Sequence, residues 1–141
     1  MTADKPAACF TIHSLTHLRA ALTAGAQSGR PIVALSAVGA SGYAGAAWFA
    51  ALTLQGRAEF PGVKLTAMLD CADRAGDVPA AVRRGITHII FTGHPEAGEK
   101  LQDIAEQMGA VILLQRPPGC DLIDAKDPFR TARLHCDASG K

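Results

Sequence analysis

Short apolar runs alternate along this chain with longer segments whose apolar residues recur at helical spacing. The runs predict strands at Cys9–Ile12, Ile32–Leu35, Val63–Leu69, Thr87–Phe91 and Val111–Leu114. Between them, helices are predicted after a cap at Ser14, from Tyr43 to Gln55, from Ala75 to Arg84 and from Ala97 to Met108. Apolar strands that alternate with helices indicate an α/β fold in which helices cover a parallel sheet.

We therefore expect a single three-layer α/β domain over residues 1–120, with about five parallel strands and helices on both faces. An open, flavodoxin-like or Rossmann-like sheet is the first expectation, and a half-barrel with neighbouring strands in sequence order is the second. Residues 121–141 are polar and aperiodic. They are expected to form a C-terminal tail, a short helix around Phe129 to Leu134, or an arm that docks on a partner.

Composition excludes several classes of protein. The 141 residues are 48% hydrophobic and carry a net charge of +1, which argues against disorder and against a nucleic-acid partner. The uncharged stretch from Pro31 to Gly56 is interrupted by glycines, so a membrane span is not expected. The four cysteines form no C-x-x-C pair, and we expect a cytoplasmic protein with reduced thiols and no zinc site.

In parallel sheets, ligands bind beyond the carboxyl ends of the strands, and this rule selects the candidate site. The residues expected there are the glycine loop with Gly39, Ser41 and Gly42, then Asp70 and Asp73, then Thr92 and His94, and finally Arg116. Backbone amides of the loop are expected to bind an anion. The alternative is that the loop's small residues only allow a close helix–strand contact.

The loop residues Val38 to Gly45, together with Pro118–Gly119–Cys120, resemble motifs of the N-acetyl-glutamyl-phosphate reductase and semialdehyde dehydrogenase group. That resemblance implies NAD(P) binding, with Asp70 as the acidic residue for the ribose. The resemblance covers about a dozen residues, and the two motifs are closer together here than in that group.

The carboxylates suggest a second kind of chemistry. Asp70 and Asp73, joined by His94, are candidates to hold Mg²⁺ or to act as a general base. The alternative is that Asp73 caps the following helix, that Asp70 binds loop amides, and that Cys71 is buried and inert. A further hypothesis pairs His94 with Arg116 around a carboxylate or phosphate.

The arrangement of Asp70, Thr92 and Arg116–Pro117 at three strand ends is similar to response-regulator receiver domains. Here Arg116 stands where that family has lysine, and His13–Ser14 stand where it has an acidic pair. His13 and His17 are read as a solvated capping turn. More broadly, Leu69–Asp70–Cys71 and Arg116–Pro117–Pro118 resemble segments of short bacterial α/β proteins without known activity.

The helix from Tyr43 to Gln55 has no charge on any face, which is typical of a helix buried on both sides. We expect a homo-oligomer through this helix, unless residues 57–62 or the C-terminal tail cover it. The expected function is binding of a small anionic ligand (phosphate, nucleotide or carboxylate). The alternatives are a metal-assisted lyase or hydrolase, with Asp70 or His94 as base, and a receiver-like interaction module without catalysis. The sequence indicates no particular cofactor.

Overall fold

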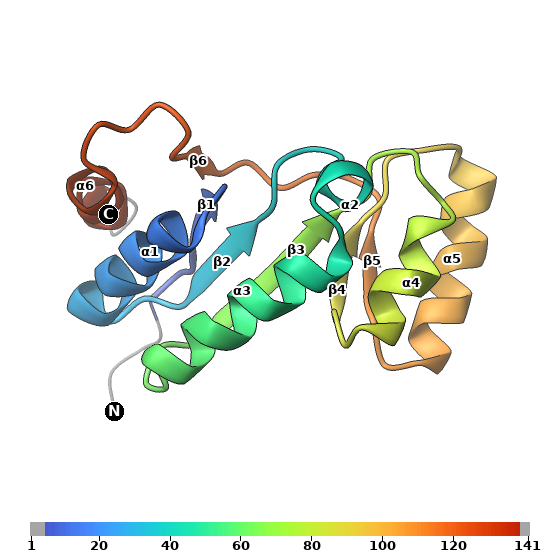
Figure 1. Ribbon diagram of the computed structural model, residues 1–141, viewed down its shortest axis with the longest axis horizontal. Helices are drawn as coiled ribbons and strands as arrows, with labels where there is room; N and C mark the ends of the chain where they lie inside the picture. The colour runs from blue at the N-terminus through green and yellow to red at the C-terminus, as the bar shows by residue number, and fades with distance from the viewer. Residues whose placement is uncertain (1–4, 139–141) are drawn as a thin grey trace. The chain divides into compact units, whose positions relative to one another are not determined.

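The computed structural model of the chain describes residues 5–138, and Figure 1 shows its elements in chain order. The strands are β1 (Ala8–Thr11), β2 (Ile32–Leu35), β3 (Leu65–Asp70), β4 (His88–Ile90), β5 (Val111–Leu113) and β6 (Cys120–Asp121). The helices are α1 (Leu15–Ser28), α2 (Ala40–Tyr43), α3 (Ala46–Glu59), α4 (Asp77–Arg83), α5 (Pro95–Gln107) and α6 (Pro128–Ala138). No helix among the described residues has the length and hydropathy that a membrane crossing requires.

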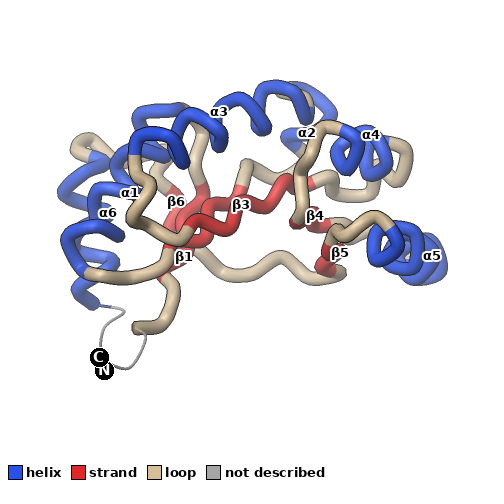
Figure 2. Tube along the Cα trace, turned by 90° about the horizontal axis from the view of Figure 1, so that it is seen from below, coloured by secondary structure: helices blue, strands red, loops and turns tan. Residues whose placement is uncertain are grey.

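The expected fold class is confirmed. The structure is α/β, and its helices flank a parallel six-stranded sheet (Figure 2), in keeping with a Rossmann-like domain. The strand order is β5-β4-β3-β2-β1-β6, so the first five strands are neighbours in sequence order. The strand order differs from the flavodoxin-like order that was expected first, and its sequence-order neighbours are the feature that the second expectation named. The sixth strand is a two-residue pairing of Cys120 and Asp121 with β1, at the point where the sequence placed the boundary between the domain and the tail.

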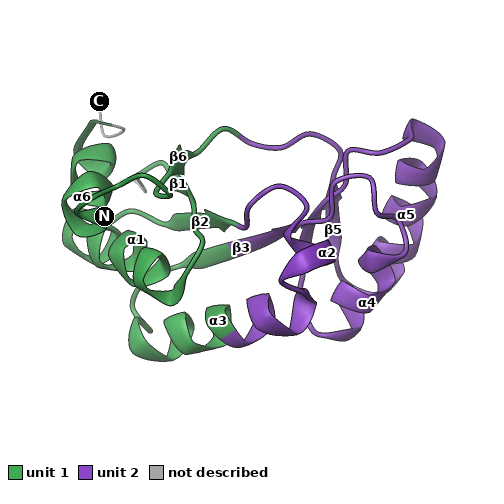
Figure 3. Ribbon diagram, turned by 45° about the horizontal axis from the view of Figure 1, so that its top comes forward, with its two compact units in different colours: residues 1–35, 52–66, 118–141 green, residues 36–51, 67–117 purple. Residues whose placement is uncertain are grey.

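The chain divides into two compact units, which Figure 3 shows in different colours. Among the described residues, unit 1 holds 5–35, 52–66 and 118–138, and unit 2 holds 36–51 and 67–117. The core of unit 1 is built from the fully buried side chains Phe10, Ile12, Leu18, Leu22, Ile32, Leu35 and Leu122. The core of unit 2 is built from Phe49, Leu69, Ile89, Ile90 and Phe91.

In unit 1, helix α6 packs along α1 (Figure 2). Ala132 and Cys136 are buried in this contact, and the ring of His135 meets Phe10 edge-on at 5.0 Å between centroids. The helix thus occupies the stretch where a tail, a short helix or a docking arm was expected, and it docks on the chain's own α1. The predicted boundary between a domain of residues 1–120 and a C-terminal tail remains a prediction.

One serine and two glycines set the start of α1, its end and its packing against β2. Ser14 caps the helix by accepting a hydrogen bond from the His17 amide at 3.1 Å, as expected. Gly29 ends it in the left-handed region at φ +72. A Cβ on Gly25 would lie 2.6 Å from a side-chain carbon of Ile32, so only glycine lets α1 approach β2 this closely.

The helix expected from Tyr43 to Gln55 is wrong in its bounds. The chain forms the single turn of α2, breaks at Gly45 with φ +88, and begins α3 at Ala46. The break falls at Gly45 because a left-handed residue cannot continue a right-handed helix. α3 then continues to Glu59, past the expected end.

Candidate functional site

The carboxyl edge of unit 2 is organised around Asp70, the last residue of β3. Its side chain is 2% exposed. The Oδ1 atom accepts hydrogen bonds from the amides of Gly39 at 3.2 Å and Ala72 at 2.7 Å, and the Oδ2 atom accepts one from Arg116 at 2.8 Å. A buried carboxylate that accepts three hydrogen bonds has its hydrogen-bonding capacity largely used within the protein. These bonds favour a structural role for Asp70 and leave it inaccessible to a ribose or a substrate proton.

Arg116 joins three segments of this edge. Besides the ion pair with Asp70, its Nη2 atom donates to the carbonyl of Ser36 at 2.9 Å. The hydroxyl of Ser36 in turn accepts the amide of Asp70 at 2.9 Å. The chain following β2, the end of β3 and the chain following β5 are therefore held together. The side chain of Arg116 remains 22% exposed.

The glycine loop folds into a tight turn over this edge. Gly39 takes φ +70 at the start of α2, a conformation that favours glycine. Its amide, which the sequence reading assigned to an anion, is used by Asp70. Ser41 points to a different carboxylate, since its hydroxyl donates to Asp77 Oδ2 at 2.8 Å.

Arg74 is the residue of this site that the sequence reading missed. Its Nε atom pairs with Asp77 Oδ2 at 2.6 Å, and this hydrogen bond is the main cause that lowers the pKa of Asp77 and raises the pKa of Arg74. A Cβ on Gly42 would lie 2.8 Å from Arg74 Nε, so the guanidinium lies directly against the glycine turn. The signal available in the sequence was the i, i+3 spacing of Arg74 and Asp77.

Asp73, Thr92 and His94 are all exposed at the same edge. The expectation that Asp73 caps the next helix is wrong, because α4 begins at Asp77 behind Gly76. His94 instead caps α5, where its Nδ1 atom accepts the Glu96 amide at 3.2 Å. Among the described residues, no three His, Cys, Asp or Glu side chains are placed to hold a metal ion.

Cys71 is buried behind the turn. Desolvation raises the pKa of its thiol to about 11, against the lowering effect of a hydrogen bond with Ser41. The thiol is therefore protonated and a poor nucleophile at neutral pH. All four cysteines are free thiols. Free thiols are what a reducing compartment maintains, and the cytoplasmic location itself stays a prediction.

Unit 1 carries a second polar cluster at the carboxyl ends of β1 and β6. His13 Nε2 lies 2.7 Å from Asp121 Oδ1, and the His13 amide donates to His17 Nδ1 at 3.1 Å. Burial, and next the nearby His13, lower the pKa of His17. The sequence reading missed this cluster because Asp121 fell in the presumed tail, and a two-residue strand leaves no periodic pattern.

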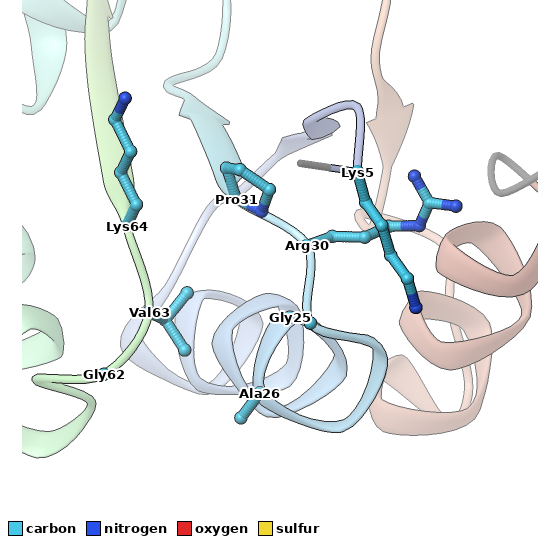
Figure 4. A pocket seen from close by; sticks show the side chains of 9 residues that line it. Lys5, Gly25, Ala26, Arg30, Pro31, Gly62, Val63 and Lys64 are labelled. Atoms are coloured by element: carbon cyan, nitrogen blue, oxygen red, sulfur yellow. The ribbon is translucent and has the colours of Figure 1, made fainter. Parts of the chain in front are cut away.

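A hollow of about 190 Å³ lies at the opposite end of the unit 1 strands (Figure 4). Lys5, Arg30 and Lys64 are the cations around it. Two of them already serve helix ends, because Lys5 Nζ donates to the Ser28 carbonyl at 2.6 Å and Arg30 Nε to the Cys136 carbonyl at 2.9 Å. Cations at helix carboxyl ends are stabilising, so this hollow is explained by the fold.

Comparisons with known proteins give the fold and no family. No protein-family model and no curated protein matches the chain. A solved structure described as a probable tagatose 6 phosphate kinase from Sinorhizobium meliloti 1021 aligns with 98% of the chain, at a TM-score of 0.57 and 15% identity. The chain spans 46% of that protein's length. Similarity at this identity establishes the shared α/β fold alone.

Proposed function

We propose that the protein binds a small anionic ligand at the glycine turn of unit 2, with Arg74 and Arg116 as its charged contacts. The observation that carries this proposal is the Arg74 guanidinium lying against Gly42. Arg116 reaches the same turn through Asp70, which holds the Gly39 amide. Phosphate and carboxylate are the groups that guanidinium binds best, through two parallel hydrogen bonds.

The two arginines differ in how readily they can bind a ligand. The side chains of the Arg74–Asp77 ion pair are 55% and 28% exposed, and solvent screens such surface pairs so that they add little to stability. Arg74 can therefore exchange Asp77 for a ligand at little cost. Arg116 is held by Asp70 and by the Ser36 carbonyl, so it offers only its exposed edge in a fixed orientation.

A catalytic function at this site has less support. The lyase or hydrolase alternative requires Asp70 or His94 as a base, but Asp70 is buried with three donors and His94 Nδ1 caps α5. The hypothesis that His94 and Arg116 together hold a carboxylate or phosphate has less support as well, because Arg116 is already bound by Asp70 and by the Ser36 carbonyl. The receiver-like interaction module remains the competing proposal.

Thermal unfolding with millimolar phosphate, pyrophosphate, ATP and citrate tests the proposal. A ligand at 100 times its Kd adds about 2.7 kcal/mol to the free energy of unfolding, or about 6–11 °C in Tm for a chain of this length. We expect one of these anions to raise Tm and Arg74→Gln to remove most of the rise. Arg83→Gln is the matched control, since Arg83 is an exposed arginine at the end of α4. The absence of any stabilising anion would favour the interaction module.

We also propose that a second copy of the chain packs on α3. Ala47, Ala51, Leu54 and Ala58 are all exposed, and their spacing places them on one face of the helix. Leu54 is 70% exposed, and no charge interrupts this face before Arg57. An uncharged face with small residues one turn apart lets two identical helices approach closely without repulsion, as a twofold axis requires.

Size-exclusion chromatography with light scattering tests this pairing. Leu54→Glu is expected to convert a dimer to a monomer without unfolding it, since the side chain already faces outward. Ile104→Glu is the matched control, because Ile104 is also exposed, on α5. A wild-type monomer, or a dimer that only Ile104→Glu disrupts, would refute pairing through α3.

A further inference from the structure

A hollow of about 280 Å³ lies on unit 1, along the second half of α1 and the start of α6. Six side chains line it: Thr23 and Gln27 from α1, and Asp127, Phe129, Arg130 and Arg133 from α6 and the residue before it. The volume lies just below the range of about 300–1,000 Å³ found for sites of drug-sized ligands. It therefore suits one small molecule and not an extended cofactor.

Two arginines give this hollow its positive charge. Arg130 and Arg133 are exposed and three residues apart, so they lie on one face of α6. Neither guanidinium forms an ion pair with any of residues 5–138, whereas Arg19, Arg74 and Arg116 each pair with a carboxylate. Two adjacent guanidiniums can bind one phosphate group together.

The other lining residues add features that a bare phosphate would not use. Phe129, in the first turn of α6, is 43% exposed and offers an aromatic face on which a flat ring can stack. Thr23 and Gln27 lie one turn apart on α1 and supply polar groups beside it. Together these residues suit a ligand with an anionic end, a flat ring and polar groups between them.

Asp127 further limits the class of ligand that the hollow can bind. Its Oδ1 atom accepts the Arg130 amide at 3.2 Å, which fixes the carboxylate at the start of α6. A carboxylate in the same hollow repels a ligand that is anionic along its whole length, such as an acidic peptide. It can instead accept hydrogen bonds from sugar hydroxyls.

We propose that this hollow is a binding site for a nucleoside monophosphate. The phosphate binds Arg130 and Arg133, the base stacks on Phe129, and the sugar hydroxyls face Asp127 and the polar groups of α1. The site is separate in sequence from the glycine turn of unit 2, and it stands on different residues from the proposed function.

Calorimetric titration of the full chain with AMP tests the site. We expect saturable binding, weakened at least tenfold in Arg130→Gln/Arg133→Gln. The control Arg83→Gln/Arg84→Gln makes the same charge change on exposed arginines of unit 2, and its Kd should stay within twofold of the wild-type value. Arg74→Gln should also leave it unchanged, so failure of this site and failure of the glycine-turn site are separable.

Two further titrations identify the contacts. Phe129→Ala should weaken AMP at least fivefold but leave the affinity for ribose 5-phosphate within twofold. If circular dichroism shows that the Gln double variant is unfolded, Arg130→Lys/Arg133→Lys replaces it. Loss of the planar guanidinium groups should still weaken AMP binding severalfold. No heat with AMP up to millimolar concentration, equal weakening by the control, or displacement of AMP by a poly-glutamate peptide would each overturn the proposal.

Discussion

The bond between Arg116 and Asp70 makes the strongest stability prediction. Arg116→Met removes the guanidinium from a carboxylate that is 2% exposed, so a negative charge stays buried without its cation. Breaking such a pair from one side costs about 3–5 kcal/mol, a large part of the roughly 5–15 kcal/mol that stabilises a typical domain. At about 3 °C per kcal/mol for this length, the expected fall in Tm is about 9–15 °C.

A double-mutant cycle separates the energy of the Arg116–Asp70 ion pair from the energy lost when side-chain packing is removed. Asp70→Asn keeps an oxygen for the Gly39 and Ala72 amides but turns an amide donor toward Arg116. The double variant carries neither charge, so its loss should be smaller than the sum of the single losses by about 1–3 kcal/mol. Urea unfolding, followed by the fluorescence of Trp48, the only tryptophan, measures the free energy of unfolding of the wild type, the two single variants and the double variant.

Arg83→Met is the control for this cycle, because Arg83 is exposed and makes the same change of side chain. It should change the free energy of unfolding by less than about 0.5 kcal/mol. A loss below 1 kcal/mol for Arg116→Met, or strictly additive losses, would refute the reasoning that Asp70 is a buried charge held by Arg116.

Three further predictions follow from single contacts. Gly25→Ala should lower the free energy of unfolding by about 1–3 kcal/mol in urea titration, because its Cβ would lie 2.6 Å from Ile32; a neutral result would mean that α1 moves away freely. The pKa of His17 is lowered in the folded chain, so the unfolded chain binds more protons just below pH 6.5, and stability should fall as pH drops through that window. His17→Gln should flatten that slope in denaturation curves at pH 7.5 and 5.5. Cys71, with a pKa of about 11, should resist iodoacetamide at pH 8 in the folded chain and react after unfolding, as mass spectrometry would show.

Local signals in the sequence predicted most of the fold. The cap at Ser14, the stop at Gly29 and the apolar runs correspond to elements of the structure because each depends on neighbouring residues. The strand order could not be predicted, since crossovers of this length fit several sheets. The break at Gly45 was missed because an uncharged helical pattern continues across it.

The sequence predicted the position of the candidate site but not the hydrogen bonds and ion pairs within it. The carboxyl-edge rule put Asp70 and Arg116 at one end of the sheet, and the structure joins them. The same rule suggested His94 as the partner of Arg116, because a sequence does not show which side chains at an edge meet. Arg74 and Asp121 were missed since their roles depend on a tertiary contact with Gly42 and on a two-residue strand.

The most direct test of the central claim is a phosphate titration followed in ¹⁵N–¹H spectra of the full chain. If the glycine turn binds the anion, the amide signals from Gly39 to Gly45 and that of Arg74 should move together and saturate, and Arg74→Gln should abolish these shifts. Spectra that stay unchanged at millimolar phosphate, or shifts confined to residues away from the turn, would contradict an anion site at the carboxyl edge of unit 2.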